Sequence, residues 1–334
     1  MRTVTVGLSL LVASCVALDT GEEAASIGTP VDGQVHIDGM KLHYRDYGGE
    51  GNLMVFVHSF FMTPHVYDEL APHFTDRYRV LAMSKRWHGT SDTTDLDFDL
   101  DTLASDIAGF IDHFTDDPAV VVGWASAGLE LPRLARLRPD LVRALVFANA
   151  VWASMPLPPG LPRWPPTGNS VDSVYPSLEA AAQHLGPGMN IRSSSALLGV
   201  LDGNLYRRED GMYAWLPPFF TRAADRFVAY YDSSAVYDGM AVPVLAIQAD
   251  YSNAMAADLE ARGFPRDTID LALRWAREYD LVSRKKGIEA LLAAVADAEV
   301  VTLDDVNHNF VIDNPDVVAR VINDFLGRLL WDAQ

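Results

Sequence analysis

Short apolar runs alternate with longer amphipathic segments along most of the chain. Each run is apolar at every position, as strands covered by helices on both faces must be. The runs lie at residues 53–57, 79–83, 119–122, 144–148, 243–247 and 299–303. Helical patterns lie at residues 66–74, 100–114, 129–137 and 315–330, with further helical segments at 266–296. The alternation predicts an α/β fold with a mostly parallel central sheet flanked by helices.

Before the first buried run, two alternating runs flank Asp38-Gly39, which is a strong hairpin signal. Ordered structure is therefore predicted to start near Val35. Residues 18–34 are small, polar and acidic and show no periodicity, so we expect a flexible tether there.

Residues 153–240 interrupt the alternation of strands and helices. The segment opens with the proline-rich stretch MPLPPGLPRWPPTG and is too long for a plain crossover. We expect a helical cap, inserted after the sixth strand over the carboxyl edge of the sheet, where ligands bind in open α/β sheets. The core is then residues 35–152 and 241–334. The aromatic residues of the cap either line an apolar pocket or pack the cap onto the sheet; they include Trp164, Tyr213, Trp215, Phe219 and Phe220.

Residues 1–17 have the layout of a secretory signal, because Arg2 precedes a short apolar run that small residues follow. Val12 to Cys15 resembles a bacterial lipoprotein box, in which Cys15 is lipidated and becomes the mature N-terminus. Cleavage after Ala17 by an ordinary signal peptidase is the alternative. Either way we expect a secreted or cell-envelope protein, which contacts a membrane only if Cys15 is lipidated. Cys15 is the only cysteine, so the mature body has no disulfide.

The formal net charge of −19 repels phosphate backbones and anionic membrane surfaces, which argues against a nucleic-acid partner. Hydrophobic residues make up 49% of the chain, enough for a sizeable core. The sequence has no HExxH motif, no thiolate zinc site and no glycine-rich nucleotide fingerprint. We therefore expect no metal or cofactor, and a small, apolar ligand or substrate.

The stretch AVVVGWASAGLELPRL reads as a buried strand, a tight turn and a helix, the order found in a nucleophile elbow. Such an elbow needs small residues two positions before and after its tip. With Ala125 at the tip these flanks are Gly123 and Ala127, and both fit. With Ser126 at the tip, Trp124 would take the crowded position. Ala125 thus occupies the nucleophile position, and its methyl group cannot form an acyl-enzyme.

These features together resemble the α/β-hydrolase superfamily (AB hydrolase-1 type) over nearly all of residues 35–330. The elbow frame Gly123 to Leu131 matches, without a gap, a bacterial subgroup that reads Gly-His-Ser-Ile-Ala-Gly-x-Glu-Leu. Ser59 follows His58 where the family has a glycine and then an oxyanion-hole residue. Trp87 replaces the first glycine of the family's Arg-Gly-x-Gly-x-Ser-Asp loop.

The resemblance implies an oxyanion hole made by the backbone N–H groups of Phe60 and Ser126. It implies that His308, after the final strand, is the catalytic base. Asn149 stands where the close subgroup has an aspartate, and an amide can orient an imidazole but cannot stabilise its protonated form. Asp250, which ends another strand, is the alternative acid.

Four departures from the family pattern predict the function: Ser59, Trp87, Ala125 and Asn149. Together they indicate an α/β-hydrolase-fold protein, ancestrally a hydrolase of small esters, amides or related substrates, that has lost serine-type hydrolysis. We expect it to keep a capped pocket for a small molecule, with Ser59, Trp87 and Trp124 around it.

Two enzymatic alternatives stay open. Ser126 could act as the nucleophile in a distorted elbow, or His308 could act alone as a general base, since proton transfer by itself contributes about 10²- to 10⁴-fold. A tethered partner-binding module is a third reading, which only the tether supports.

Overall fold

The structure is a computed structural model. It describes residues 3–6, 29–60, 62–93, 99–162, 174–189, 191, 193–215, 237–304 and 306–329. Cys15, most of the predicted signal and tether segments, and Trp164, Phe219 and Phe220 of the predicted cap lie outside these ranges.

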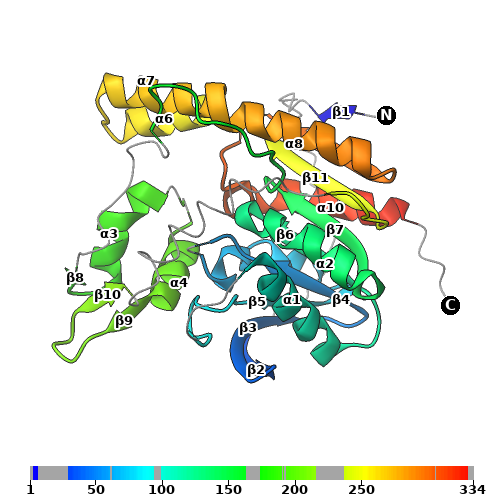
Figure 1. The fold of residues 1–334 in the computed structure, drawn as a ribbon. Coiled ribbons are helices and arrows are strands. Elements are labelled where there is room, and N and C mark those ends of the chain that lie inside the picture. The colour runs from blue at the N-terminus through cyan, green and yellow to red at the C-terminus, as the bar shows by residue number, and fades with distance from the viewer. Residues whose placement is uncertain are drawn as a thin grey trace, which may run out of the picture.

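A nine-stranded sheet in the order β1-β12-β11-β7-β6-β4-β5-β3-β2 forms the centre of the fold (Figure 1). Neighbouring strands are parallel from β1 to β5, and β3 and β2 continue the sheet in antiparallel fashion. The strands are β1 (Thr3–Val6), β2 (Val31–Ile37), β3 (Met40–Gly48), β4 (Asn52–Val57), β5 (Tyr78–Met83), β6 (Ala119–Trp124), β7 (Val142–Ala148), β11 (Val244–Ala249) and β12 (Ala298–Leu303). The α/β fold class and all six strands predicted from apolar runs are confirmed.

The predicted hairpin joins β2 to β3, with Ile37 opposite Met40. Asp38 and Gly39 have φ values of 48° and 80°, the left-handed pair that a tight hairpin turn requires. Strand β2 begins at Val31, so residues 31–34 pair with β3 and the predicted tether is too long at its C-terminal end. The alternation of small and polar residues there gave no apolar signal.

Strand β1 lies within the segment predicted to be a signal peptide and pairs with β12 at the edge of the sheet. Removal of that segment would leave β12 as the edge strand. Among the described residues, no helix combines the length and the apolar character needed to cross a bilayer.

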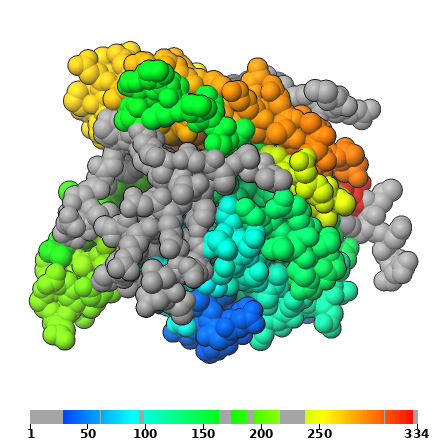
Figure 2. Space-filling model, viewed as in Figure 1, coloured from blue at the N-terminus to red at the C-terminus, as the bar shows by residue number. Residues whose placement is uncertain are grey.

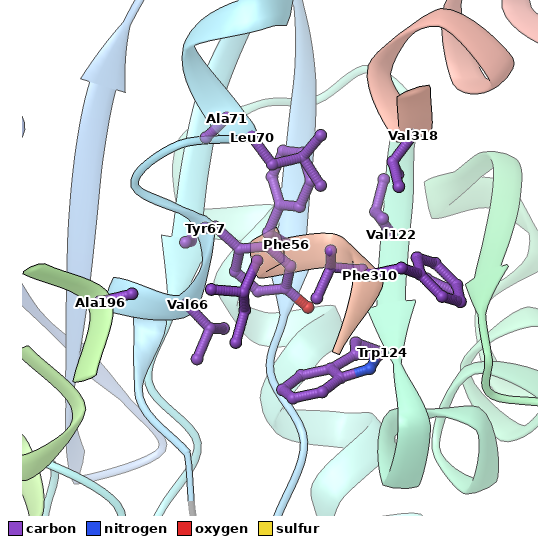
Figure 3. Close-up of a cluster of buried hydrophobic side chains, with 14 of the residues drawn as sticks. Phe56, Val66, Tyr67, Leu70, Ala71, Val122, Trp124, Ala196, Phe310 and Val318 are labelled. Carbon is purple, nitrogen blue, oxygen red and sulfur yellow. The ribbon is translucent and has the colours of Figure 1, made fainter. Parts of the chain in front are cut away.

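Helices cover both faces of the sheet because successive residues of each buried strand point to opposite sides. Val55 and Val121 face one core with α1 (Leu100–Phe114), α2 (Leu131–Leu137) and α8 (Leu281–Ala294). Phe56 and Val122 face the other with α9 (Phe310–Asp313) and α10 (Pro315–Arg328), as Figure 3 shows.

One predicted helix forms differently from expectation. Residues 66–74 were predicted as a single helix, but the chain makes two 3₁₀ turns, η1 (Pro64–Tyr67) and η2 (Ala71–Phe74). Pro72 explains the break, because proline lacks an N–H and clashes with the preceding turn of an α-helix.

The described part of the predicted cap contains α3 (Leu178–Met189) and α4 (Ser194–Asn204). It also contains a three-stranded antiparallel sheet in the order β8 (Val174–Tyr175), β10 (Tyr213–Trp215), β9 (Leu205–Arg207). The prediction of a helical cap is therefore incomplete, because strands this short leave no periodic pattern. Figure 2 shows this light green part at one end of the molecule.

The connection from β11 to β12 is helical, as predicted, and runs through α6 (Ser252–Ala261), α7 (Arg266–Trp275) and α8. A π-helical turn, Ala276–Asp280, joins α7 to α8. Such turns are rare in proteins, and those that do occur are often found at functional sites.

Substitution of Gly287 in α8 tests the packing of this helix against the core, and substitution of Gly327 in α10 is the control. A Cβ on Gly287 would lie 2.4 Å from the main chain of Trp152, whereas a Cβ on Gly327, in α10, would meet nothing within 4 Å. We expect Gly287→Ala to lower the free energy of unfolding by about 1–3 kcal/mol through overpacking. Gly327→Ala should raise it by up to about 1 kcal/mol by restricting the unfolded chain. Urea titration measures both, and equal effects would contradict the close approach.

Candidate active site

The turn between β6 and α2 carries a residue in a strained conformation. Ala125 follows the strand with a φ of 47°, in the left-handed region, and begins the 3₁₀ turn Ala125–Leu129 that leads into α2. A left-handed residue at a strand-to-helix junction is the geometry of a nucleophile elbow. The structure thus places Ala125 at the tip, the position assigned to the nucleophile.

Close contacts explain why the elbow needs small residues. A Cβ on Gly123 would lie 2.9 Å from the methyl groups of Leu131 and 3.0 Å from the Cβ of Ala127. A Cβ on Gly128 would lie 1.7 Å from the carbonyl oxygen of Ala150, which no local shift could accommodate. The strand, the turn and the neighbouring loop after β7 are therefore packed at main-chain distance.

The Ser126 hydroxyl occupies one predicted oxyanion-hole donor. The backbone N–H of Phe60 donates to Ser126 Oγ at 2.6 Å, and Ser59 Oγ lies 3.4 Å from the same atom. Both Ser126 and Phe60 are buried. Only the backbone of Ser126 was predicted at this hole, yet its hydroxyl accepts the N–H that a developing oxyanion would need.

His308 and Asn149 meet as the resemblance implies. The amide Nδ2 of Asn149 lies 2.6 Å from Nδ1 of His308, and Asn149 is fully buried at the end of β7. Trp124 Nε1 donates to the carbonyl oxygen of His308 at 3.3 Å, and the two rings pack with centroids 5.6 Å apart. The histidine is thereby held beside the elbow.

The surroundings of His308 disfavour its charged form. Burial, followed by the charge of Arg284, lowers the pKa of His308 to about 3, and the charge of Asp280 acts in the opposite direction. A catalytic histidine must become protonated during the reaction. Within the described residues, the contacts of this ring are with Asn149, Trp124 and Tyr251, none of which carries a carboxylate to stabilise that state. His308 is therefore neutral at physiological pH and a weak proton acceptor.

A buried network behind Asn149 was missed from the sequence. Tyr251 donates its hydroxyl to Asp280 Oδ2 at 2.5 Å, and Arg284 Nε donates to the same oxygen at 2.6 Å. Arg284 Nη1 also donates to the carbonyl oxygen of Asn149 at 2.6 Å. The only available signal was the i,i+4 spacing of Asp280 and Arg284, which is typical of many surface helices.

Asp250, the alternative acid, lies elsewhere. It is exposed, and its carboxylate accepts from the N–H and the hydroxyl of Ser252 at 3.1 and 2.8 Å, at the start of α6. This is a turn-capping arrangement. The structure brings Asn149 to the histidine, and not Asp250.

Left-handed backbone conformations concentrate at the site. Among the described residues, four non-glycine residues have positive φ, and three of them, Trp87 (71°), Ala125 (47°) and Asn149 (48°), are departures from the family pattern. For a residue as bulky as tryptophan such a φ is costly. The main chain has kept a conformation suited to glycine at residue 87 although the side chain has changed.

A buried ion pair links the end of the elbow to the loop after β5. Lys85 Nζ lies 2.8 Å from Glu130 Oε1, and both side chains are buried. The pair joins the loop after β5 to the start of α2. Two buried histidines lie beside it, with the rings of His58 and His88 4.8 Å apart. Burial, followed by the charge of Lys85, lowers the pKa of His88 to about 3.

A cavity of about 510 Å³ lies between the β2–β3 hairpin, η1 and α4. Its lining includes the polar residues Asp32, His43, Thr63, His65 and Asp202. The residues predicted to surround a capped pocket, Ser59, Trp87 and Trp124, do not line it. Within the described ranges, no three His, Cys, Asp or Glu side chains are grouped so that they could hold a metal ion.

The fold and the elbow together identify the class. The chain belongs to the alpha/beta hydrolase family, whose model matches residues 54–321. The strand order and the positions of the site at the ends of β4, β6, β7 and β12 agree with that membership.

Several hydrolases are similar to this chain. The 2-(acetamidomethylene)succinate hydrolase of Mesorhizobium japonicum is 32% identical over 113 residues, 34% of this chain and 40% of that protein. The non-heme chloroperoxidase of Streptomyces lividans is 33% identical over 117 residues, 34% of this chain and 42% of that protein. A solved E-2-(acetamidomethylene)succinate hydrolase superposes with a TM-score of 0.65 at 20% identity, covering 90% of this chain and all of the other. The sequence matches thus span less than half of each relative, and the structural likeness shows the fold.

The neutral buried histidines predict an acid-sensitive fold. A histidine whose pKa falls from 6.5 to about 3 on folding binds a proton in the unfolded chain but not in the folded one over that range. Stability is therefore present above pH 6.5 and is lost as the pH falls. We expect His88→Gln to reduce the acid slope of the free energy of unfolding by up to about 1.4 kcal/mol per pH unit.

Denaturant titrations at several pH values below 6.5 measure this slope. His113→Gln serves as the matched control, because His113 is exposed on α1. Parallel curves for the wild type and His88→Gln would show that His88 does not titrate on unfolding.

Proposed function

We propose that this protein is a member of the alpha/beta hydrolase family that has lost serine-type hydrolysis and binds a small molecule beside its altered elbow. One observation carries the proposal: the strained tip of the elbow holds Ala125, while the Ser126 hydroxyl takes up the N–H of Phe60. The hydroxyl that would attack the substrate is missing, and the N–H of Phe60, which would stabilise the resulting oxyanion, is already hydrogen-bonded.

The position of Ser126 counts against it as a substitute nucleophile. Its oxygen accepts from Phe60 N–H, which is a donor that the oxyanion of an attacked carbonyl would need. Nucleophile and oxyanion would have to share that one donor. Ser126 is also buried beyond the tip, so attack would require the elbow to rearrange.

The pairing of His308 counts against it as a lone general base. Efficient general bases have pKa values close to the working pH, whereas the pKa of His308 is lowered to about 3. Asn149 adds no negative charge that would raise this pKa. Binding without turnover agrees with this arrangement better than proton abstraction does.

The ligand and the location are part of the proposal. The name of the Mesorhizobium japonicum relative, 2-(acetamidomethylene)succinate hydrolase, gives that protein a small organic substrate, which supports a small-molecule ligand here. We further propose a secreted or cell-envelope protein, with lipid on Cys15 or cleavage after Ala17. The intact mass of the mature N-terminus from the native host distinguishes the two, and an unprocessed Met1 would contradict both.

Aryl acetate hydrolysis by the full chain tests the loss of catalysis. We expect neither burst acylation nor turnover above background in the wild type or in Ser126→Ala. Ala125→Ser should show at most a slow burst, since Ser126 still holds Phe60 N–H and Asn149 supplies no charge that would help His308 to accept a proton. Ala125→Ser combined with Ser126→Ala should acylate about 10²- to 10³-fold faster than Ala125→Ser alone, because that donor is released. Stopped-flow absorbance measures each burst.

Two outcomes would overturn the proposal. Wild-type turnover that Ser126→Ala abolishes would identify Ser126 as the nucleophile. Wild-type turnover that survives Ser126→Ala but is lost in His308→Ala would identify a histidine-based reaction.

A further inference from the structure

The contact between Asn149 and His308 constrains which nitrogen of the imidazole carries the proton. An amide nitrogen can only donate a hydrogen bond. Because Nδ2 of Asn149 lies 2.6 Å from Nδ1 of His308, Nδ1 must accept that bond and carry no proton. A neutral imidazole then has its proton on Nε2, the opposite of the arrangement in which an aspartate holds Nδ1–H.

The reverse orientation of the amide is less favourable. As placed, Asn149 leaves one buried carbonyl oxygen, Oδ1, without a partner. A flip would let Oδ1 accept from Nδ1–H and would move the NH₂ group to the buried place of Oδ1. As placed, the unpaired atom is a carbonyl oxygen, and an under-satisfied buried C=O is commoner in proteins than an unpaired buried N–H. The tautomer inferred for His308 belongs to this placed orientation.

Other groups at the site also present donors. Ser126 Oγ accepts from Phe60, so its own proton remains to donate, either to Ser59 at 3.4 Å or to a ligand. Within the described residues, Nε2 of His308 has no hydrogen-bond partner, and the residue is partly accessible. The two cations that contact this region are paired with carboxylates, Lys85 with Glu130 and Arg284 with Asp280. A neutral acceptor therefore fits better than an anion.

We propose that Asn149 reverses the polarity of His308, so that the ring donates Nε2–H into the site and the ligand presents a neutral carbonyl oxygen to it. The inference rests on the proposed function, because a site that only binds has no need of a base. In a hydrolase the same ring face must accept a proton from serine. The replacement of aspartate by asparagine thus converts a base into a binding group.

Nitrogen NMR of histidine-labelled full chain decides the tautomer. We expect His308 to show a pyrrole-type Nε2 and a pyridine-type Nδ1 in the wild type. Asn149→Asp can only accept, so it should move the proton to Nδ1 and raise the pKa of His308. Asn323→Asp adds the same charge on α10, remote from the ring, and should leave the pattern unchanged.

Binding of three probes of similar size tests the ligand class: cyclohexanone, cyclohexanecarboxylate and cyclohexylamine. We expect cyclohexanone to shift the His308 Nε2–H signal and to bind about tenfold more weakly to Asn149→Asp, the loss of roughly one hydrogen bond. Tighter binding of the carboxylate or the amine than of the ketone, or no ketone-induced shift, would overturn the ligand assignment.

The proposed tautomer of His308 and the proposed loss of hydrolysis can be contradicted separately. A proton on Nδ1 in the wild type would overturn the polarity reversal even if the protein hydrolyses nothing. Ester turnover by the wild type with the proton on Nε2 would instead overturn the proposed function and leave the tautomer in place.

Discussion

The structure around the site depends on one constraint, the main-chain contact between the elbow and the loop after β7. Gly128 approaches the carbonyl of Ala150 so closely that any side chain would collide with it. This contact fixes the turn at Ala125 in the left-handed region and brings Asn149, one residue before Ala150, next to the same turn. His308 then reaches Asn149 from the end of β12. The relative positions of Ala125, Asn149 and His308 are thus set by main-chain packing and do not depend on whether their side chains can react.

The apolar runs predicted the sheet well, because strands buried on both faces have a pattern that few other elements share. The elbow could also be predicted, since the small flanks of Ala125 are a steric requirement of the turn. The ion pairs could not be predicted. Asp280 and Arg284 lie far along the chain from the elbow, and Lys85 is 45 residues from Glu130, so the sequence alone does not pair them. The choice between Asn149 and Asp250 needed coordinates, because both residues end a strand at the same edge. Trp87 gave no sign of its positive φ beyond the family's glycine.

The side chains of this site depart from the family motif, whereas its main chain has the left-handed conformation that the motif requires. Ala125, Asn149 and Trp87 each occupy left-handed backbone, although none of the three side chains can do what the family motif requires there. The backbone is held by neighbours that also serve the core, so it cannot relax when catalysis is lost. The side chains of Ala125 and Asn149 differ from the family motif without disturbing this backbone. Under the proposed function, the fold keeps the shape of an active site although the reaction is absent.

The hydrogen bond from Phe60 to Ser126 has a consequence for the balance between activity and stability. An active hydrolase leaves its oxyanion donors without a protein partner until substrate arrives, which costs about 1–3 kcal/mol for a buried donor. Here the hydroxyl of Ser126 acts as a permanent internal ligand, and that cost is absent. If hydrolysis has been lost as proposed, the loss has relieved a destabilised site, as the trade-off between stability and activity leads one to expect. A ligand that binds beside the elbow, as proposed, must either displace the serine or bind around it.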